Sequence, residues 1–426
     1  MSLSLVIAPP SRLKPWLATA WRYGLSASGP VATSGAHFLA SLLFVRNLSA
    51  ASFGLFSFVL VIVPFAMSMT ASLLVIPVTR SLTQSPEQRA AVVASCMKMN
   101  ALLALATTLA VFLLLLLAHA ELLAALLLGL FGGAFTFRWF VRSFAFVEGR
   151  AKTAVACDLI YALVLIGGLG LLAWQHKLSL SAGGLCLLLA ALASMAPAGR
   201  NFFAVQWSAL FNGRLGLYAN IFRDVTRWSL TGVVLTEMTV NAHAYLVTFI
   251  SGPGSFAVLA LGMLLMRPAS LVQSALPDLE RPRMTRQIAA RDWPGLTRTR
   301  QEFAAGLILM LVVTMVLDAG LLGWFPSLVL KKGYAFNSAV IVTLISAVIM
   351  AVRALRTPPA VQMQAVGTFR ELAVIGTKSS VISLIATLGL LLAFGPIASL
   401  CGVLCGEVAI LTETRKLMRR WEQKRD

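Results

Sequence analysis

Residues 34–58 read SGAHFLASLLFVRNLSAASFGLFSF, a stretch that joins two long apolar runs through a short polar segment. Arg46 is the one charged residue in it. An α-helix needs about 20 apolar residues to cross roughly 30 Å of hydrocarbon, and the runs on either side of Arg46 are long enough to do so. The stretch therefore predicts two membrane-spanning helices joined by an elbow, and the rest of the chain repeats this pattern.

The composition is that of an integral membrane protein. Of the 426 residues, 58% are hydrophobic and only 12% are charged, and the mean hydropathy is +0.85. Long unbroken apolar runs predict helices, since a helix satisfies its own backbone hydrogen bonds inside the bilayer. We predict an all-α membrane protein with twelve transmembrane helices, at residues 25–45, 53–78, 91–117, 121–144, 154–174, 182–203, 229–250, 255–277, 302–325, 337–356, 372–394 and 396–414.

The net charge of +19 invites a nucleic-acid partner, so the placement of the cations matters. Nearly all lysines and arginines fall in alternate connections, which the positive-inside rule assigns to the cytoplasm together with both termini. This bias explains the charge, and we predict contact with anionic membrane lipids and no nucleic acid. The exceptions are Arg46, Lys177, Lys331 and Lys332 on the outer side, and Lys98 and Arg267 inside spans.

A weak internal repeat predicts two six-helix lobes. Ala36-His37 and Ser52-Phe53 recur as Ala242-His243 and Ser255-Phe256, which aligns the first two spans with the seventh and eighth. Six spans return the chain to the same side, as parallel repeats around a central cavity require. The predicted parts are an interfacial segment at 1–24, an N-lobe at 25–205, a cytoplasmic linker at 206–228, a C-lobe at 229–414 and a basic tail at 415–426.

The elbow after the first span also resembles a known family. Arg46, Leu48 and Ser49, two small residues, then Ser52, Phe53 and Gly54 are similar to the opening of bacterial polysaccharide or O-antigen repeat-unit flippases of the Wzx type. These belong to the multidrug/oligosaccharidyl-lipid/polysaccharide exporter superfamily. Many relatives have an acid and a proline where this chain has Ala50 and Ala51.

The resemblance implies a flippase that moves undecaprenyl-diphosphate-linked oligosaccharides across the bacterial cytoplasmic (inner) membrane by alternating access, for lipopolysaccharide or exopolysaccharide synthesis. A polysaccharide polymerase or chain-length regulator is the expected protein partner. The alternatives are a multidrug or cation antiporter of the same superfamily and a non-transporting scaffold for glycan assembly. Because phosphate-binding loops, metal-ligand spacings and nucleophile elbows are absent from the sequence, we predict no enzyme and no cofactor.

Charges deep in predicted spans are the best site candidates, because a charge at the bilayer centre is costly and usually functional. Arg267, beside Pro268 in the eighth span, can bind a phosphate or pair with Glu237 at similar depth in the seventh. Glu237 and Asn241 share a helix face, with His243 nearby. Glu237 can take up a proton or Na⁺ from a driving gradient or merely neutralise Arg267.

Six other residues complete the candidate substrate path. His37 occupies the repeat position of His243 and is either a gate or an interhelical hydrogen-bond donor. Lys98 and Asp158 can pair near the cytoplasmic side, and Arg138 and Arg142 form a basic face at the inner mouth or anchor the topology. Arg46 attracts the head group at exit or caps carbonyls at its helix end. The list of predicted residues is Arg267, Glu237, Asn241, His243, His37, Lys98, Asp158, Arg138, Arg142 and Arg46.

Overall fold

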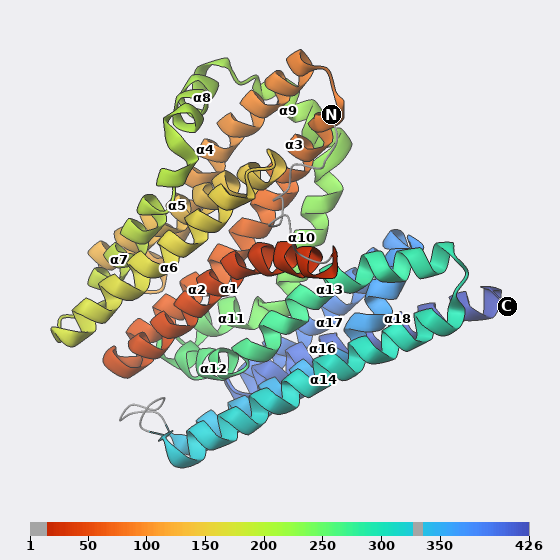
Figure 1. Ribbon diagram of the computed structural model, residues 1–426. Helices are drawn as coiled ribbons and strands as arrows, with labels where there is room; N and C mark the ends of the chain where they lie inside the picture. The colour runs from red at the N-terminus through yellow and green to blue at the C-terminus, as the bar shows by residue number, and fades with distance from the viewer. Residues whose placement is uncertain (1–14, 327–334, 426) are drawn as a thin grey trace. The chain divides into compact units, whose positions relative to one another are not determined.

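The computed structural model describes residues 15–326 and 335–425, and the secondary structure of these ranges is helical throughout (Figure 1). Eight helices there can cross a membrane by length and composition, or ten if each of two bent pairs is one span. The first and last predicted spans lie within α1 (Pro15–Asn47) and α18 (Ser399–Arg425). The prediction of an all-α protein with twelve spans is confirmed. Lys331, Lys332 and residues 1–14 of the predicted interfacial segment lie outside the described residues.

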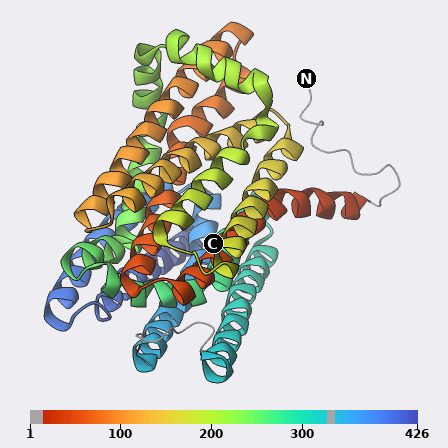
Figure 2. The same cartoon turned by 90° about the vertical axis from the view of Figure 1, so that its left-hand side faces the viewer.

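The chain divides into two compact units. The first comprises the chain up to Leu48 together with Val59–Val233, and the second comprises Ser49–Phe58 together with the chain from Val234 onward. The helix α2 (Ala50–Thr70) therefore begins in the second unit and ends in the first. In both views α4 and α5, drawn in orange to yellow, lie side by side (Figures 1 and 2).

Small residues and helix caps shape the first unit. Ser85 accepts a hydrogen bond from the Gln88 amide at the start of α4, as N-cap serines do. A Cβ at Gly133 of α5 would lie 2.6 Å from the Ala104 carbonyl oxygen, so only glycine permits this approach of two helices. The remaining elements up to the division are η1 (Ala71–Val75), α3 (Ile76–Arg80), η2 (Ser81–Thr83), α4 (Pro86–Leu117), α5 (Leu122–Val147), α6 (Ala151–Trp174), α7 (Leu180–Ala193), η3 (Ala196–Ala198), α8 (Gly199–Asn212), α9 (Leu215–Ile221), η4 (Phe222–Thr226) and α10 (Arg227–Val240).

The second unit is held together in the same way. A Cβ at Gly402 of α18 would lie 2.3 Å from the Thr387 amide nitrogen of α17, so these two helices meet backbone to backbone. Its further elements are α11 (Ala242–Ile250), α12 (Pro253–Leu265), α13 (Arg267–Ala289), α14 (Trp293–Trp324), α16 (Phe336–Val366) and α17 (Phe369–Phe394). Residues 206–228, predicted as a solvated linker, carry the end of α8, then α9 and η4.

Two spans of the second unit are broken near their middles. α10 and α11 meet at an angle of 52° at Asn241, and α12 and α13 meet at 59° at Met266. The second break has a direct chemical cause. Pro268 lacks the N–H that would bond to Leu264, and its ring restricts Arg267 before it. Both breaks fall where the sequence placed its deepest candidate charges, Glu237 and Arg267.

Candidate functional site

A cavity of about 130 Å³ lies within the second unit beside both helix breaks. Apolar side chains from α12, α16 and α18 form most of its wall. Its polar lining consists of Asn241, His243, Arg267, Ser270, Ser346 and Arg353. Three of the predicted site residues therefore lie around one cavity. They are Asn241 at the first break, His243 in α11 and Arg267 in α13.

Arg267 is the first residue of α13 and lines this cavity half-buried. Among the side chains that the structure describes, no carboxylate lies within ion-pair distance of its guanidinium. Glu237, its predicted alternative partner, instead accepts hydrogen bonds from Tyr245 Oη at 2.7 Å and Asn241 Nδ2 at 3.0 Å. The pair between Arg267 and Glu237 is not formed, so Arg267 has no counterion among these described side chains.

The two repeat-related histidines have different environments. His37 lies inside the continuous helix α1, and its Nε2 is hydrogen-bonded to Tyr161 Oη of α6 at 2.6 Å. His243 lies in the first turn of α11, only 3% exposed, and neither of its ring nitrogens has a hydrogen-bond partner among the described residues. His37 therefore has the interhelical bond expected of a membrane histidine. The His243 ring lines the cavity, and its nitrogens are free of hydrogen bonds to the described residues.

A second cavity arginine was missed by the sequence reasoning. Arg353 of α16 lines the cavity, and its Nε donates to Glu407 Oε1 of α18 at 2.7 Å. Arg356, one turn further along α16, forms an ion pair with the other oxygen of Glu407 at 2.6 Å. Glu407 is fully buried. A carboxylate deep in the mostly apolar last span implies a cationic partner, and this signal could have led to the two arginines.

The first unit contains a similar arrangement, which we call the α5 triad. Asp158 of α6 is 1% exposed and binds Arg138 at 2.7 Å through Oδ1 and Arg142 at 2.6 Å through Oδ2. The sequence placed these arginines on an exposed basic face, but Arg138 is fully buried and Arg142 nearly so. A free basic face at this position is not formed.

The expected pair between Lys98 and Asp158 is wrong. Lys98 Nζ donates to the Gly213 carbonyl at 3.2 Å, which ties α4 to the end of α8. Position along a predicted span does not say toward which neighbour a helix face turns. The carboxylate of Asp158 already has both oxygens occupied by guanidinium groups.

Arg46 lies exposed in the last turn of α1. The carbonyl of Leu43 in this turn accepts a hydrogen bond from Asn47 Nδ2 at 2.7 Å. Asn47 therefore provides a cap of the kind that was one of the two predicted roles of Arg46.

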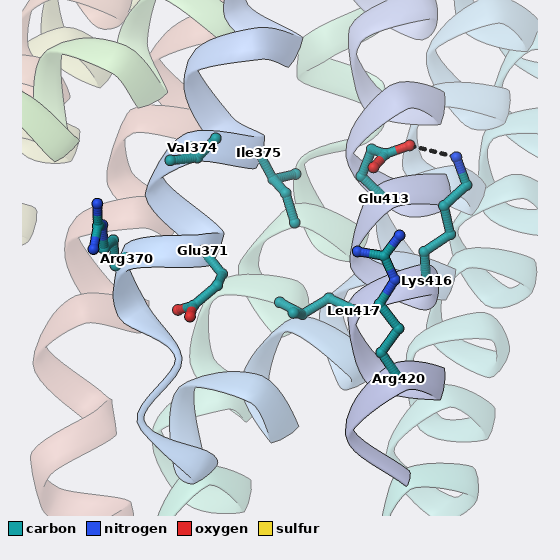
Figure 3. A pocket seen from close by; sticks show the side chains of 8 residues that line it. All are labelled: Arg370, Glu371, Val374, Ile375, Glu413, Lys416, Leu417 and Arg420. Carbon is teal, nitrogen blue, oxygen red and sulfur yellow. Dashed lines mark hydrogen bonds and ion pairs between the residues drawn. The ribbon is translucent and has the colours of Figure 1, made fainter. Parts of the chain in front are cut away.

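A groove of about 380 Å³ lies between the start of α17 and the end of α18 (Figure 3). Its charged lining is mixed, and Glu413 is bonded to Lys416 at 2.6 Å within it. Arg420 extends along α18 toward this pair, whereas Arg370 points away from it (Figure 3). The groove contains none of the predicted path residues. We therefore place the candidate site in the cavity at the helix breaks.

Solved structures with the same fold are transporters and flippases. An inward-facing multidrug resistance MATE-family transporter of the MOP superfamily matches with a TM-score of 0.70, 12% identity, and coverage of 93% of this chain and 99% of its own. Lipid II flippase MurJ, in an inward closed conformation, matches with a TM-score of 0.68, 11% identity, and coverage of 92% and 87%.

A third match is a MOP-superfamily transporter from Pyrococcus furiosus Vc1, described as having a binding pocket of reverse polarity that suggests a different function. Its TM-score is 0.58 at 12% identity, with 93% of this chain and 95% of that chain covered. No protein-family model matches the sequence, and no curated protein matches it. The chain thus has the fold of MOP-superfamily transporters.

Proposed function

We propose that the protein is a transporter that works by alternating access and moves undecaprenyl-diphosphate-linked oligosaccharide repeat units across a bacterial cytoplasmic membrane. The carrying observation is Arg267, a half-buried cation without a counterion among the described residues, at the break of a spanning helix. Discontinuous helices with inward N-termini are a recurrent way to hold anionic groups inside a bilayer. The likeness of fold to a lipid II flippase supports the same reading.

The chemistry of such a cargo suits this arrangement. A diphosphate and its sugars cannot enter hydrocarbon unaided, whereas a polyprenyl tail can stay in the lipid throughout. A planar guanidinium offers paired donors that match phosphate oxygens. The protein therefore needs to replace water only around the head group.

The cavity charge weighs against a cationic drug as cargo. Two arginines, Arg267 and Arg353, line the cavity, and its described lining includes no carboxylate. A cationic drug would be repelled from this wall. A multidrug or cation antiporter is the alternative function, because a multidrug transporter has the same fold. A scaffold for glycan assembly is the third possible outcome of the test below.

Deletion of the gene followed by lipid analysis tests the proposal. Lipid-linked repeat units should accumulate in the cytoplasmic leaflet and surface glycan should fall. Unchanged surface glycan with altered drug tolerance would establish the antiporter instead. Loss of glycan assembly without accumulation of the lipid-linked unit would indicate a scaffold.

Complementation then tests the site. At equal membrane abundance, Arg267→Ala should restore no export and Arg267→Lys should restore part of it, because lysine keeps the charge but loses the paired donors. Arg200→Ala, at an exposed position in the first turn of α8 and outside the predicted substrate path, is the control and should restore export. Normal export by Arg267→Ala would remove this residue from the transport path.

A further inference from the structure

Each unit carries two arginines one turn apart on its fourth predicted span, and both guanidinium groups bind one buried carboxylate. In the first unit this is the α5 triad. In the second unit Arg353 and Arg356 of α16 share Glu407 of α18, and we call this group the α16 triad. Each triad has one cation more than its carboxylate neutralises.

The α5 triad is closed by its packing. The Arg138 guanidinium lies 5.0 Å from the centre of the Phe135 ring and 4.6 Å from that of Tyr161. Its Nε donates to Ser194 Oγ at 2.8 Å. A Cβ at Gly29 would lie 2.2 Å from Asp158 Oδ2, so the carboxylate is covered by backbone as well. The aromatic faces stabilise the extra cation, and its position favours a structural role.

The α16 triad opens onto the cavity instead. Arg353 contributes to the wall that also holds Arg267 and His243. At about 30 Å³ for each water in the liquid, the cavity of about 130 Å³ has room for a phosphoryl group but not for a glycan. The N-terminus of α13, with its orphan N–H groups and positive dipole end, begins at the same wall. His243 adds a buried ring whose nitrogens have no partner among the described residues.

We infer that the α16 triad is a releasable anion site. Arg353 leaves Glu407 and joins Arg267 around an oxyanion of the diphosphate class, while Arg356 keeps Glu407 compensated. Removing both partners from a buried carboxylate is strongly unfavourable, but a carboxylate with two arginines retains one ion pair when the other departs. Arg356 thus allows Arg353 to exchange Glu407 for the bound anion, although Arg356 itself does not contact that anion. This inference rests on the proposed function for the identity of the cargo, but not for the existence of the site.

Binding of inorganic diphosphate to the purified full-length protein in neutral-lipid nanodiscs, followed by calorimetry, tests the exchange. Arg353→Ala should weaken binding about tenfold or more, as loss of one charge-assisted hydrogen bond predicts. Glu407→Gln should strengthen binding, because a neutral amide releases Arg353. Arg356→Ala should weaken binding although it does not line the cavity, since Glu407 then holds Arg353 alone.

The opposite signs of Glu407→Gln and Arg356→Ala separate exchange from general damage, which would weaken binding in both. Glu148→Gln, in the exposed pair with Arg89 and outside the predicted substrate path, is the control and should leave diphosphate affinity unchanged. Monodispersity in size-exclusion chromatography verifies folding of each variant. Weaker binding by Glu407→Gln, or full affinity in Arg353→Ala, would overturn the inference.

Two further arms separate the sources of the phosphate and the two proposals. If phosphatidylglycerol nanodiscs abolish diphosphate binding, a lipid head group occupies the site and the cargo assignment falls. Predicted binding with normal glycan export in the deletion strain would keep the site and refute the flippase function. If the purified protein does not bind diphosphate while export still depends on Arg267, the anion site is refuted and the flippase function is kept.

Discussion

Gly54 lies in the first turns of α2, where the start of α12 approaches it. A Cβ at this position would lie 1.8 Å from the carbonyl oxygen of Pro253, a backbone atom that cannot rotate away. Beyond it, Phe58 packs edge to face against Tyr245 and Phe256, with ring centres 5.5 and 6.4 Å apart. The glycine of the elbow signature therefore has a physical reason within the second unit.

We expect Gly54→Ala to destabilise the protein by about 1–3 kcal/mol, the usual cost of overpacking, despite the better helix propensity of alanine. Thermal unfolding of the detergent-solubilised protein measures the change. Gly35→Ala is the matched control, because a Cβ there meets nothing within 4 Å and should leave stability unchanged or raise it. Equal melting temperatures for the two variants would contradict the close contact.

At the residue scale, position within the predicted spans identified the charged residues but not the side chains that they contact. Arg267 and Glu237 were selected by their position inside spans, and they lie at the two helix breaks of the second unit. Their separate environments depend on helix rotation around the axis, which one sequence with near-uniform apolar faces does not encode. The same limit explains why Lys98 was assigned to Asp158.

Helix breaks are the element that distinguishes the two halves of the repeat. α1 runs without interruption through His37, whereas the corresponding span breaks at Asn241 before His243. Prolines marked several of these irregularities in the sequence. Pro77 and Pro268 lie in the first turns of α3 and α13, but Pro64 lies inside the uninterrupted α2.

Pro268→Ala should lower diphosphate affinity and glycan export several-fold while the protein remains folded. Alanine restores an N–H that can bond to the Leu264 carbonyl, so the helix can continue and carry Arg267 away from the cavity. Titration calorimetry and surface-glycan assays report the two effects. Pro64→Ala is the control and should change neither, and an unaltered Pro268→Ala protein would show that other contacts set the bend.

For the molecule as a whole, composition and span counting were sufficient to predict the fold. Twelve apolar runs and the charge bias led to the architecture of solved MOP-superfamily proteins. This chain is only 11 or 12% identical to them. The boundary between units was harder to predict, because residues 49–58 group with the second unit although they precede most of the first. Such a grouping depends on contacts distant in sequence, which periodicity does not report.

We propose that Glu237 couples the proposed transport to an ion gradient. Its carboxylate is buried, bonded by Tyr245 and Asn241, and without a cationic partner among the described residues. In proteoliposomes with imposed proton or Na⁺ gradients, Glu237→Gln should lose the stimulation by the coupling gradient, because the amide cannot bind either cation. Glu148→Gln, at an exposed pair with Arg89, should retain it. Full stimulation of Glu237→Gln would place coupling elsewhere.

The two triads also differ in when they can form during synthesis. Arg142 and Asp158 are 16 residues apart, so α5 and α6 can enter the membrane as a hairpin in which Asp158 already pairs with its arginines. Arg353 and Glu407 are 54 residues apart. At about 5–20 residues per second, α16 waits on the order of 3–10 s with two arginines uncompensated before α18 emerges. α18 thus supplies the carboxylate that pairs with both arginines of α16. A nascent chain truncated before α18 would hold α16 at the membrane without this carboxylate.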